Sequence, residues 1–65
     1  MMGKVRRGGY VFIAWKGDHP PRHVHIYRGG RFVVKWDLDN HKPMKGAASR
    51  KLLDLIGDLE SEGRL

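Results

Sequence analysis

The stretch HVHIYRGGRFVVKWDL, residues 23–38, carries the strongest structural signal in the chain. Two runs rich in β-branched and aromatic residues flank Gly29 and Gly30, and a two-residue glycine linker is typical of a tight β-hairpin. Side chains on a strand alternate between the two faces of a sheet. This alternation predicts an apolar inner face made of Val24, Ile26, Phe32, Val34, Trp36 and Leu38.

The opposite face of the same hairpin is polar and cationic. Alternation places His23, His25 and Tyr27 of the first strand on this outer face, together with Arg31 and Lys35 of the second. Flat rings beside positive charges suit stacking on bases and contact with phosphates. The pattern therefore indicates a surface for a polyanion.

Further elements extend the hairpin on both sides. The segment YVFIAWK, residues 10–16, is typical of another strand, and the two prolines after it predict a turn. Residues 1–9 are basic and glycine-rich, which favours a mobile leader. Residues 46–63 carry apolar side chains at helical spacing, so they predict an amphipathic helix that covers the inner face.

The predicted fold class is therefore α+β. It consists of an antiparallel three-stranded sheet with one C-terminal helix packed on one face, in the order β-β-β-α. Residues 1–65 are expected to form a single domain, since 65 residues bury only a small core. So small a core also makes a cognate protein partner or a homodimer a reasonable expectation.

Composition limits the function classes. The chain has a net charge of +6 and no cysteine, which excludes a disulfide scaffold and thiolate zinc sites and fits a cytoplasmic protein. No segment is long enough to predict a membrane span, and no motif indicates a cofactor. Residues 1–36 carry eight lysines and arginines against one aspartate. The basic first half therefore predicts binding of nucleic acid, with RNA favoured over DNA.

The candidate contacts to nucleic acid come from the outer face, the proline turn and the start of the helix. Lys45, Arg50 and Lys51 surround a helix N-terminus, where free N–H groups attract anions. The alternative is that Arg50 and Lys51 pair with Asp54, which lies four and three residues further along the helix. The full predicted set is His19, Arg22, Tyr27, Arg28, Arg31, Lys35, Lys45, Arg50 and Lys51.

The histidines leave several interpretations open, and the sequence does not decide whether the protein is an enzyme. His23 and His25 are candidate catalytic residues of a metal-independent ribonuclease, in which an imidazole removes the proton of a ribose 2′-hydroxyl. Alternatively, the two rings act in binding alone. If a metal is bound, His19, His23 and His25 are the expected ligands, although the positive surroundings disfavour a cation. A purely structural role, with hydrogen bonds in a turn and strand, is the fourth option.

The segment DHPPRHVH, residues 18–25, resembles the hallmark of the family called domain of unknown function 4160, Asp/Glu-His-x-Pro-Pro-His-x-His. The hairpin after it, the loop at Gly46 and the C-terminal helix extend the resemblance over roughly residues 10–60. Matching positions are Asp18, His19, Pro21, His23 and His25, whereas the proline pair stands one place earlier here. The resemblance implies a small bacterial protein, often encoded in a two-gene arrangement like a toxin–antitoxin module, with a role for the motif histidines.

Overall fold

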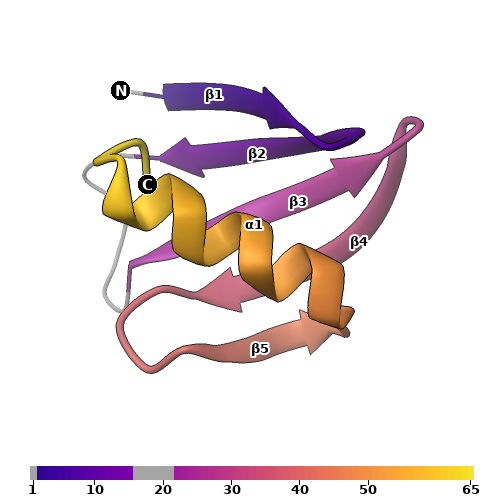
Figure 1. Cartoon of the computed structure of the whole chain (residues 1–65). Helices are drawn as coiled ribbons and strands as arrows, with labels where there is room; N and C mark the ends of the chain where they lie inside the picture. Colours follow the sequence, from indigo (N-terminus) through magenta and orange to yellow (C-terminus); the bar gives the residue numbers. More distant parts are fainter. Residues whose placement is uncertain (1, 16–21) are drawn as a thin grey trace.

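The computed structural model describes residues 2–15 and 22–65 of the chain. It contains five strands and one helix (Figure 1). In chain order these are β1 (Met2–Arg7), β2 (Tyr10–Trp15), β3 (His23–Arg28), β4 (Arg31–Asp37), β5 (Lys42–Gly46) and α1 (Arg50–Ser61).

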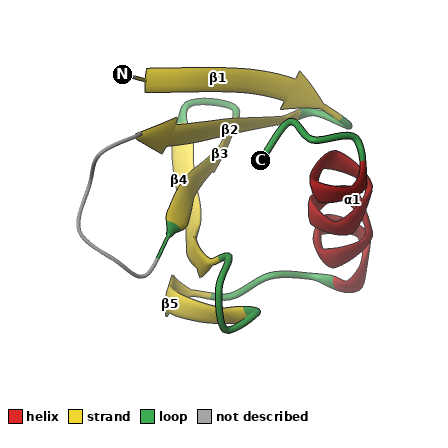
Figure 2. Ribbon diagram, turned by 90° about the vertical axis from the view of Figure 1, so that its left-hand side faces the viewer, coloured by secondary structure: helices red, strands yellow, loops and turns green. Residues whose placement is uncertain are grey.

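The strands form one antiparallel sheet in the order β1-β2-β3-β4-β5, so every strand pairs with its neighbour in sequence. Helix α1 lies against one side of this sheet (Figure 2). The α+β class and the single covering helix are as predicted. The prediction of a three-stranded sheet is wrong, because a further strand pairs at each edge.

The additional strand β1 replaces the expected leader. Gly8 and Gly9 have φ angles of 60° and 85°, and together they form a two-residue turn that pairs Arg7 with Tyr10. Positive φ at both central positions is the requirement of the type I′ hairpin turn. Residues 2–7 are therefore an edge strand rather than a mobile leader.

The other additional strand, β5, pairs with β4 after the turn at residues 38–41. Pro43 has no N–H to donate, which restricts it to a position where the missing hydrogen bond would face away from the sheet. An edge strand offers that position. The turn itself has His41 in the left-handed region, with φ of 53°.

Asp37 organises this turn. Its carboxylate accepts hydrogen bonds from the backbone N–H groups of Asp39 and Asn40, both at 2.9 Å, and from the side-chain amide of Asn40 at 2.8 Å. These bonds, the Asn40 side chain first, lower the pKa of Asp37 although burial opposes them. The side chain is 2% exposed, so it acts as a structural anion.

The core lies between the sheet and the helix. Leu52, Ile56 and Leu59 of α1 are buried against the inner side of the sheet, and each contributes about 1.5–3 kcal/mol by leaving water. The sheet supplies Tyr10, Phe12, Val24, Ile26, Val34 and Trp36, and Leu38 follows β4. The predicted inner residues Val24, Ile26, Val34, Trp36 and Leu38 are confirmed.

Phe32 departs from the predicted inner face. The register between β3 and β4 shifts at Ile26 and Tyr27, so that Ile26 pairs with Val34 but Tyr27 pairs with Phe32. A β-bulge of this kind inserts one extra residue and reverses the alternation beyond it. Phe32 is consequently 42% exposed and contacts Tyr27 edge to face, with 5.8 Å between ring centroids.

Helix α1 begins and ends with defined caps. The Ser49 hydroxyl accepts a hydrogen bond from the Leu52 N–H at 3.2 Å. At the other end, Gly63 has φ of 74° and donates to the Glu60 carbonyl, while Arg64 donates to Leu59. This pair of bonds is the Schellman motif. Among the described residues, no helix has the length and apolar character needed to cross a membrane.

Arg7 fastens β1 to the end of the helix. Its guanidinium forms a bidentate ion pair with the Glu62 carboxylate. The hydrogen bond from Nη2 to Oε1 measures 2.9 Å. The hydrogen bonds from Arg7 lower the pKa of Glu62. Arg7 therefore points toward α1, and it contributes no free charge to the other side of the sheet.

Candidate nucleic-acid interface

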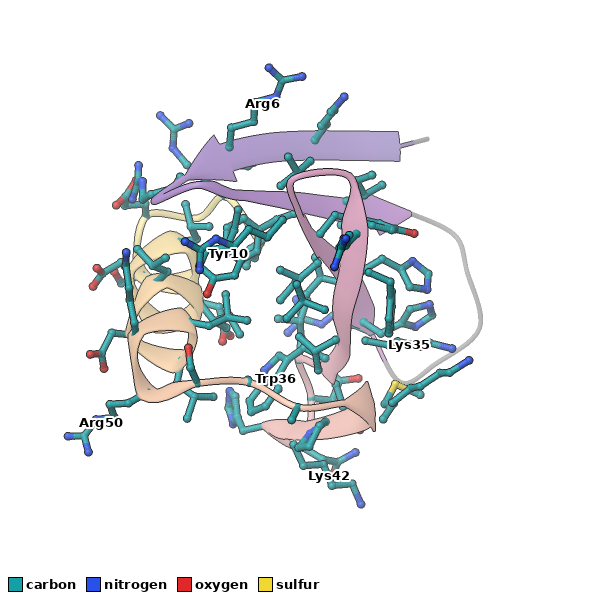
Figure 3. All side chains as sticks on the ribbon, turned by 90° about the vertical axis from the view of Figure 1, so that its right-hand side faces the viewer. Arg6, Tyr10, Lys35, Trp36, Lys42 and Arg50 are labelled. Carbon is teal, nitrogen blue, oxygen red and sulfur yellow. The ribbon has the colours of Figure 1, made fainter. Side chains whose placement is uncertain are left out.

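The candidate site is the face of the sheet opposite α1, here called the outer face. Figure 3 shows Lys35 on this face, with Tyr10 and Trp36 on the side that faces the helix. Alternation from the buried core residues and the pairing of the strands assign the rest. The outer face includes Lys4, Arg6, Val11, Ile13, His23, His25, Tyr27, Phe32, Lys35 and Lys45.

Register arranges these side chains in rows that run across the strands. One row crosses all five strands and pairs each residue with the next: Lys4, Ile13, His25, Lys35 and Lys45. Neighbouring strands are about 4.8 Å apart, so this row extends over roughly 19 Å. We call it the basic row, since it presents three lysines and one imidazole.

A second row lies beside the basic row. It pairs Arg6, Val11, Tyr27 and Phe32 across β1 to β4. Residues two apart on a strand are separated by about 7 Å, which is the distance between the two rows. Val11 and Tyr27 are half-buried, while Arg6 and Phe32 are exposed. We call this the aromatic row.

The two histidines of β3 lie where the sequence predicted them. The ring centroids of His23 and His25 are 5.4 Å apart with the rings nearly perpendicular, and both side chains are half-buried. His25 pairs with Lys35 in register, and His23 pairs with Asp37. The structure therefore places two imidazoles and the Lys35 side chain on one surface, with Lys35 directly across the sheet from His25.

Two predicted arginines lie elsewhere. The guanidinium carbon of Arg28 is 5.4 Å from the centroid of the Tyr10 ring, a cation–π contact on the helix side of the sheet. Arg31 pairs with Arg28 beyond the bulge, where the alternation has reversed. The expectation that Arg31 shares a face with Lys35 is therefore wrong, and Phe32 occupies that side instead.

Arg22 lies at the end of the sheet and is engaged by Asp39. Its backbone N–H and its Nε each donate to the Asp39 carboxylate at 2.9 Å. The two bonds lower the pKa of Asp39, the backbone bond most, and the side-chain bond raises the pKa of Arg22. The Arg22 side chain is still 64% exposed, but it already forms an ion pair with Asp39 within the protein.

The anion site predicted at the helix N-terminus does not form as one cluster, because Lys45 and Arg50 lie on opposite sides of the sheet. Lys45 pairs with Lys35 and belongs to the basic row. Arg50 points away from the sheet on the helix side (Figure 3) and lies 4.0 Å from Asp54. The Arg50–Asp54 ion pair of the alternative is therefore present, and Ser49 is used as the helix cap.

A metal centre is supported by nothing in the described residues, which contain no group of three His, Cys, Asp or Glu side chains able to hold an ion. The predicted third ligand His19, together with Asp18, lies outside the described residues. The nearest carboxylate in register, Asp37, is occupied by the turn it organises. The hypothesis of a three-histidine site thus stays a prediction.

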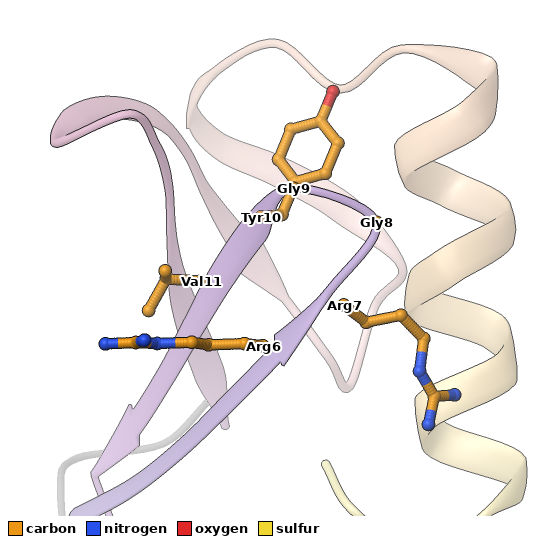
Figure 4. Close-up of a pocket in the computed structure, with 6 residues that line it drawn as sticks. All are labelled: Arg6, Arg7, Gly8, Gly9, Tyr10 and Val11. Atoms are coloured by element: carbon orange, nitrogen blue, oxygen red, sulfur yellow. The ribbon is translucent and has the colours of Figure 1, made fainter.

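A shallow depression of about 430 Å³ lies on the β1–β2 hairpin (Figure 4). Arg6 and Val11 extend to one side of it and Arg7 to the other, toward α1. Its lining comes from one hairpin alone: Arg6, Arg7, Gly8, Gly9, Tyr10 and Val11. The depression lies at the turn end of that hairpin, and the extended surface remains the better candidate.

Sequence reasoning missed several members of the outer face, namely Lys4, Arg6, Val11, Ile13 and Phe32. Lys4 and Arg6 lie within residues 1–9, for which the sequence predicts a mobile leader. The signal that places them is the Gly8–Gly9 pair, which has the same form as Gly29–Gly30.

Comparison with known proteins found no matching family model, no matching curated protein and no matching solved structure. The resemblance of residues 18–25 to the family of unknown function therefore stays a prediction. The geometry of the outer face is therefore the basis for the proposed function.

Proposed function

We propose that the outer face binds single-stranded nucleic acid, with RNA favoured over DNA. The observation that carries the proposal is the parallel arrangement of a basic row and an aromatic row about 7 Å apart. Lysines suit the phosphates of a strand, and aromatic rings suit stacking with its bases. A single nucleic-acid strand that lies across the β-strands can contact both rows at the same time.

The aromatic rings of the outer face favour a single-stranded nucleic acid over a duplex. Tyr27 and Phe32 offer ring surface to bases, but in a duplex the faces of the bases are stacked on one another. A row about 19 Å long matches roughly four nucleotides, at the low end of the site sizes of small sheet-based binders. The expected ligand is therefore a short, unpaired segment.

The preference for RNA is proposed from the two histidines. His23 and His25 lie beside Lys35, and imidazole nitrogens both donate and accept hydrogen bonds. A ribose 2′-hydroxyl is the group that distinguishes RNA from DNA at a given site. Contact of either ring with that hydroxyl would favour RNA.

A ribonuclease is the second candidate, and the same histidine pair favours it. One imidazole would take the proton of the 2′-hydroxyl as its oxygen attacks phosphorus. The other, as imidazolium, would give a proton to the departing 5′-oxygen, leaving a 2′,3′-cyclic phosphate. The Lys35 ammonium, opposite His25, would stabilise the added charge on the phosphoryl oxygens.

The two candidates are separated by one series of titrations. A fluorescein-labelled oligouridine is titrated with the protein at low and moderate salt, beside oligodeoxythymidine and an RNA duplex, and the RNA is analysed afterwards on a denaturing gel. The binding proposal expects affinity for the single strands that falls as salt rises. Cleavage that is lost in His25→Ala while binding persists would establish the ribonuclease. Absence of binding at low salt would overturn both candidates.

A further inference from the structure

The two edges of the sheet differ in how well they are protected. Strand β5 is short, contains Pro43, and has a register irregularity against β4 at Lys35 and Trp36. A proline, a bulge and a short length are the features by which proteins prevent strands from pairing with an edge. The β5 edge is thus closed to further strands.

Strand β1 has none of these three features. Charge also protects sheet edges, and β1 carries it as Lys4 and Arg6, which repel a cationic strand but attract an anionic one. The six residues of β1 pair with β2 in an unbroken register, without proline and without a bulge. Among the described residues it is the outermost strand on that side (Figure 1). Regular, unpaired backbone of this kind is a template for a further strand.

The tight turn determines which backbone groups face outward. In a two-residue hairpin the residues that close the loop exchange backbone hydrogen bonds, so Arg7 faces Tyr10. The orientation alternates along the strand, and Val5 therefore also faces β2. The N–H and C=O groups of Lys4 and Arg6 point away from β2, toward the side where the described residues form no further strand.

The side chains at these positions define the chemistry of an incoming strand. Lys4 and Arg6 project on the outer face, so residues that pair with them directly would lie beside two positive charges. Val5 projects on the other face, where it is half-buried and packs against the core. A residue paired with Val5 would extend that apolar surface.

We propose that the edge of β1 binds an extended segment of a partner protein with an acidic–apolar–acidic pattern. The acidic residues pair with Lys4 and Arg6, and the apolar residue lies beside Val5. A second copy of this chain is a poor occupant, because antiparallel pairing of two β1 strands centred on Val5 sets Lys4 of each copy opposite Arg6 of the other. This inference goes beyond nucleic-acid binding and does not depend on it.

The test is amide hydrogen exchange with a capped peptide of alternating glutamate and valine. In the free protein, Lys4 and Arg6 should exchange fast, while the amides of Val5 and Arg7, which face β2, provide an internal reference. At peptide saturation we expect slow exchange at Lys4 and Arg6. Unchanged exchange at these two amides would overturn the proposal. Slow exchange at Lys4 and Arg6 without added peptide, at concentrations where the chain is dimeric, would point to self-pairing instead.

Two variants and one control peptide complete the design. Lys4→Pro removes an outward N–H, whereas Lys4→Gln removes the charge and keeps the N–H. Loss of one backbone hydrogen bond corresponds to about a tenfold weaker complex, so Lys4→Pro should bind less well than Lys4→Gln. A peptide with the same residues in blocks, glutamates first, should bind more weakly than the alternating one. If both peptides bind with equal affinity, the charge of the peptide alone accounts for binding, and this result would contradict strand pairing.

Discussion

His25 of β3 and Lys35 of β4 are paired directly across the sheet, on the face that α1 leaves uncovered. Lys45 of β5 continues the same row beyond Lys35. Three adjacent strands therefore bring an imidazole and two ammonium groups into line, although residues 25 and 45 are far apart in the sequence. This alignment is the physical basis of the proposed polyanion site.

Lys35→Ala should weaken binding of oligouridine at low salt and reduce the slope of log affinity against log salt by about 1, since one phosphate contact is lost. Arg50→Ala is the matched control. Arg50 is equally cationic, but it lies on the helix side and pairs with Asp54. Fluorescence anisotropy over a range of salt concentrations measures both variants, and an equal loss in the two would refute a localised site.

The aromatic row should contribute through stacking rather than charge. Phe32→Ala should cost about 1–3 kcal/mol of binding free energy without changing the salt slope. Phe32→Tyr keeps the ring and should bind as the original protein does. Because Phe32 is 42% exposed, the melting temperature should change little in either variant. An Ala variant that binds normally would remove the aromatic row from the site.

Asp37 should make folding sensitive to acid. Hydrogen bonds from Asn40 and Asp39 lower its pKa in the folded state. Its contribution to stability is therefore complete above the pKa of an aspartate in the unfolded chain, about 3.9, and is lost as the pH falls through the lower folded-state pKa. Asp37→Asn should lower the melting temperature at neutral pH and flatten its decline on the acid side.

The control for that experiment is Asp54→Asn on the exposed face of α1, where the carboxylate is 71% exposed. Thermal denaturation followed by circular dichroism across acidic pH compares the two variants. If Asp37→Asn melts at the same temperature as Asp54→Asn, the carboxylate does not organise the turn.

Two glycines should respond to alanine in opposite directions. A Cβ at Gly46 would lie 2.3 Å from the Val33 carbonyl oxygen, and its φ of 83° already disfavours a side chain. Gly46→Ala should therefore destabilise the protein by about 2 kcal/mol or more. Gly57 is helical and a Cβ there meets nothing within 4 Å, so Gly57→Ala should stabilise by about 0.5–1 kcal/mol. Urea denaturation measures both changes, and any gain in Gly46→Ala contradicts the packing described.

The central hairpin and the helix could be predicted because local chemistry determines them. Gly29 and Gly30 set the turn, and Leu52, Ile56 and Leu59 repeat at helical spacing. The edge strands were harder to predict. The strand segments MGKVRR and KPMKG lack the apolar alternation of a half-buried strand, and each becomes a strand because a neighbour supplies hydrogen bonds.

The site was predictable to the same extent. Alternation placed His23, His25, Tyr27 and Lys35 on the outer face, and the structure agrees. Strict alternation does not predict the β-bulge between β3 and β4 opposite Ile26 and Tyr27. It therefore puts Phe32 on the inner face and Arg31 on the outer face, whereas the structure has the reverse. Lys4 and Arg6 depended on recognising Gly8 and Gly9 as a second hairpin turn.

The most direct test of the proposed interface is an NMR titration of the isotope-labelled protein with a short single-stranded RNA at two salt concentrations. The account predicts salt-sensitive shifts in the basic and aromatic rows, centred on His25, Tyr27, Phe32 and Lys35, with Arg50 and Asp54 unmoved. Shifts confined to the helix, or no shifts at low salt, would contradict it.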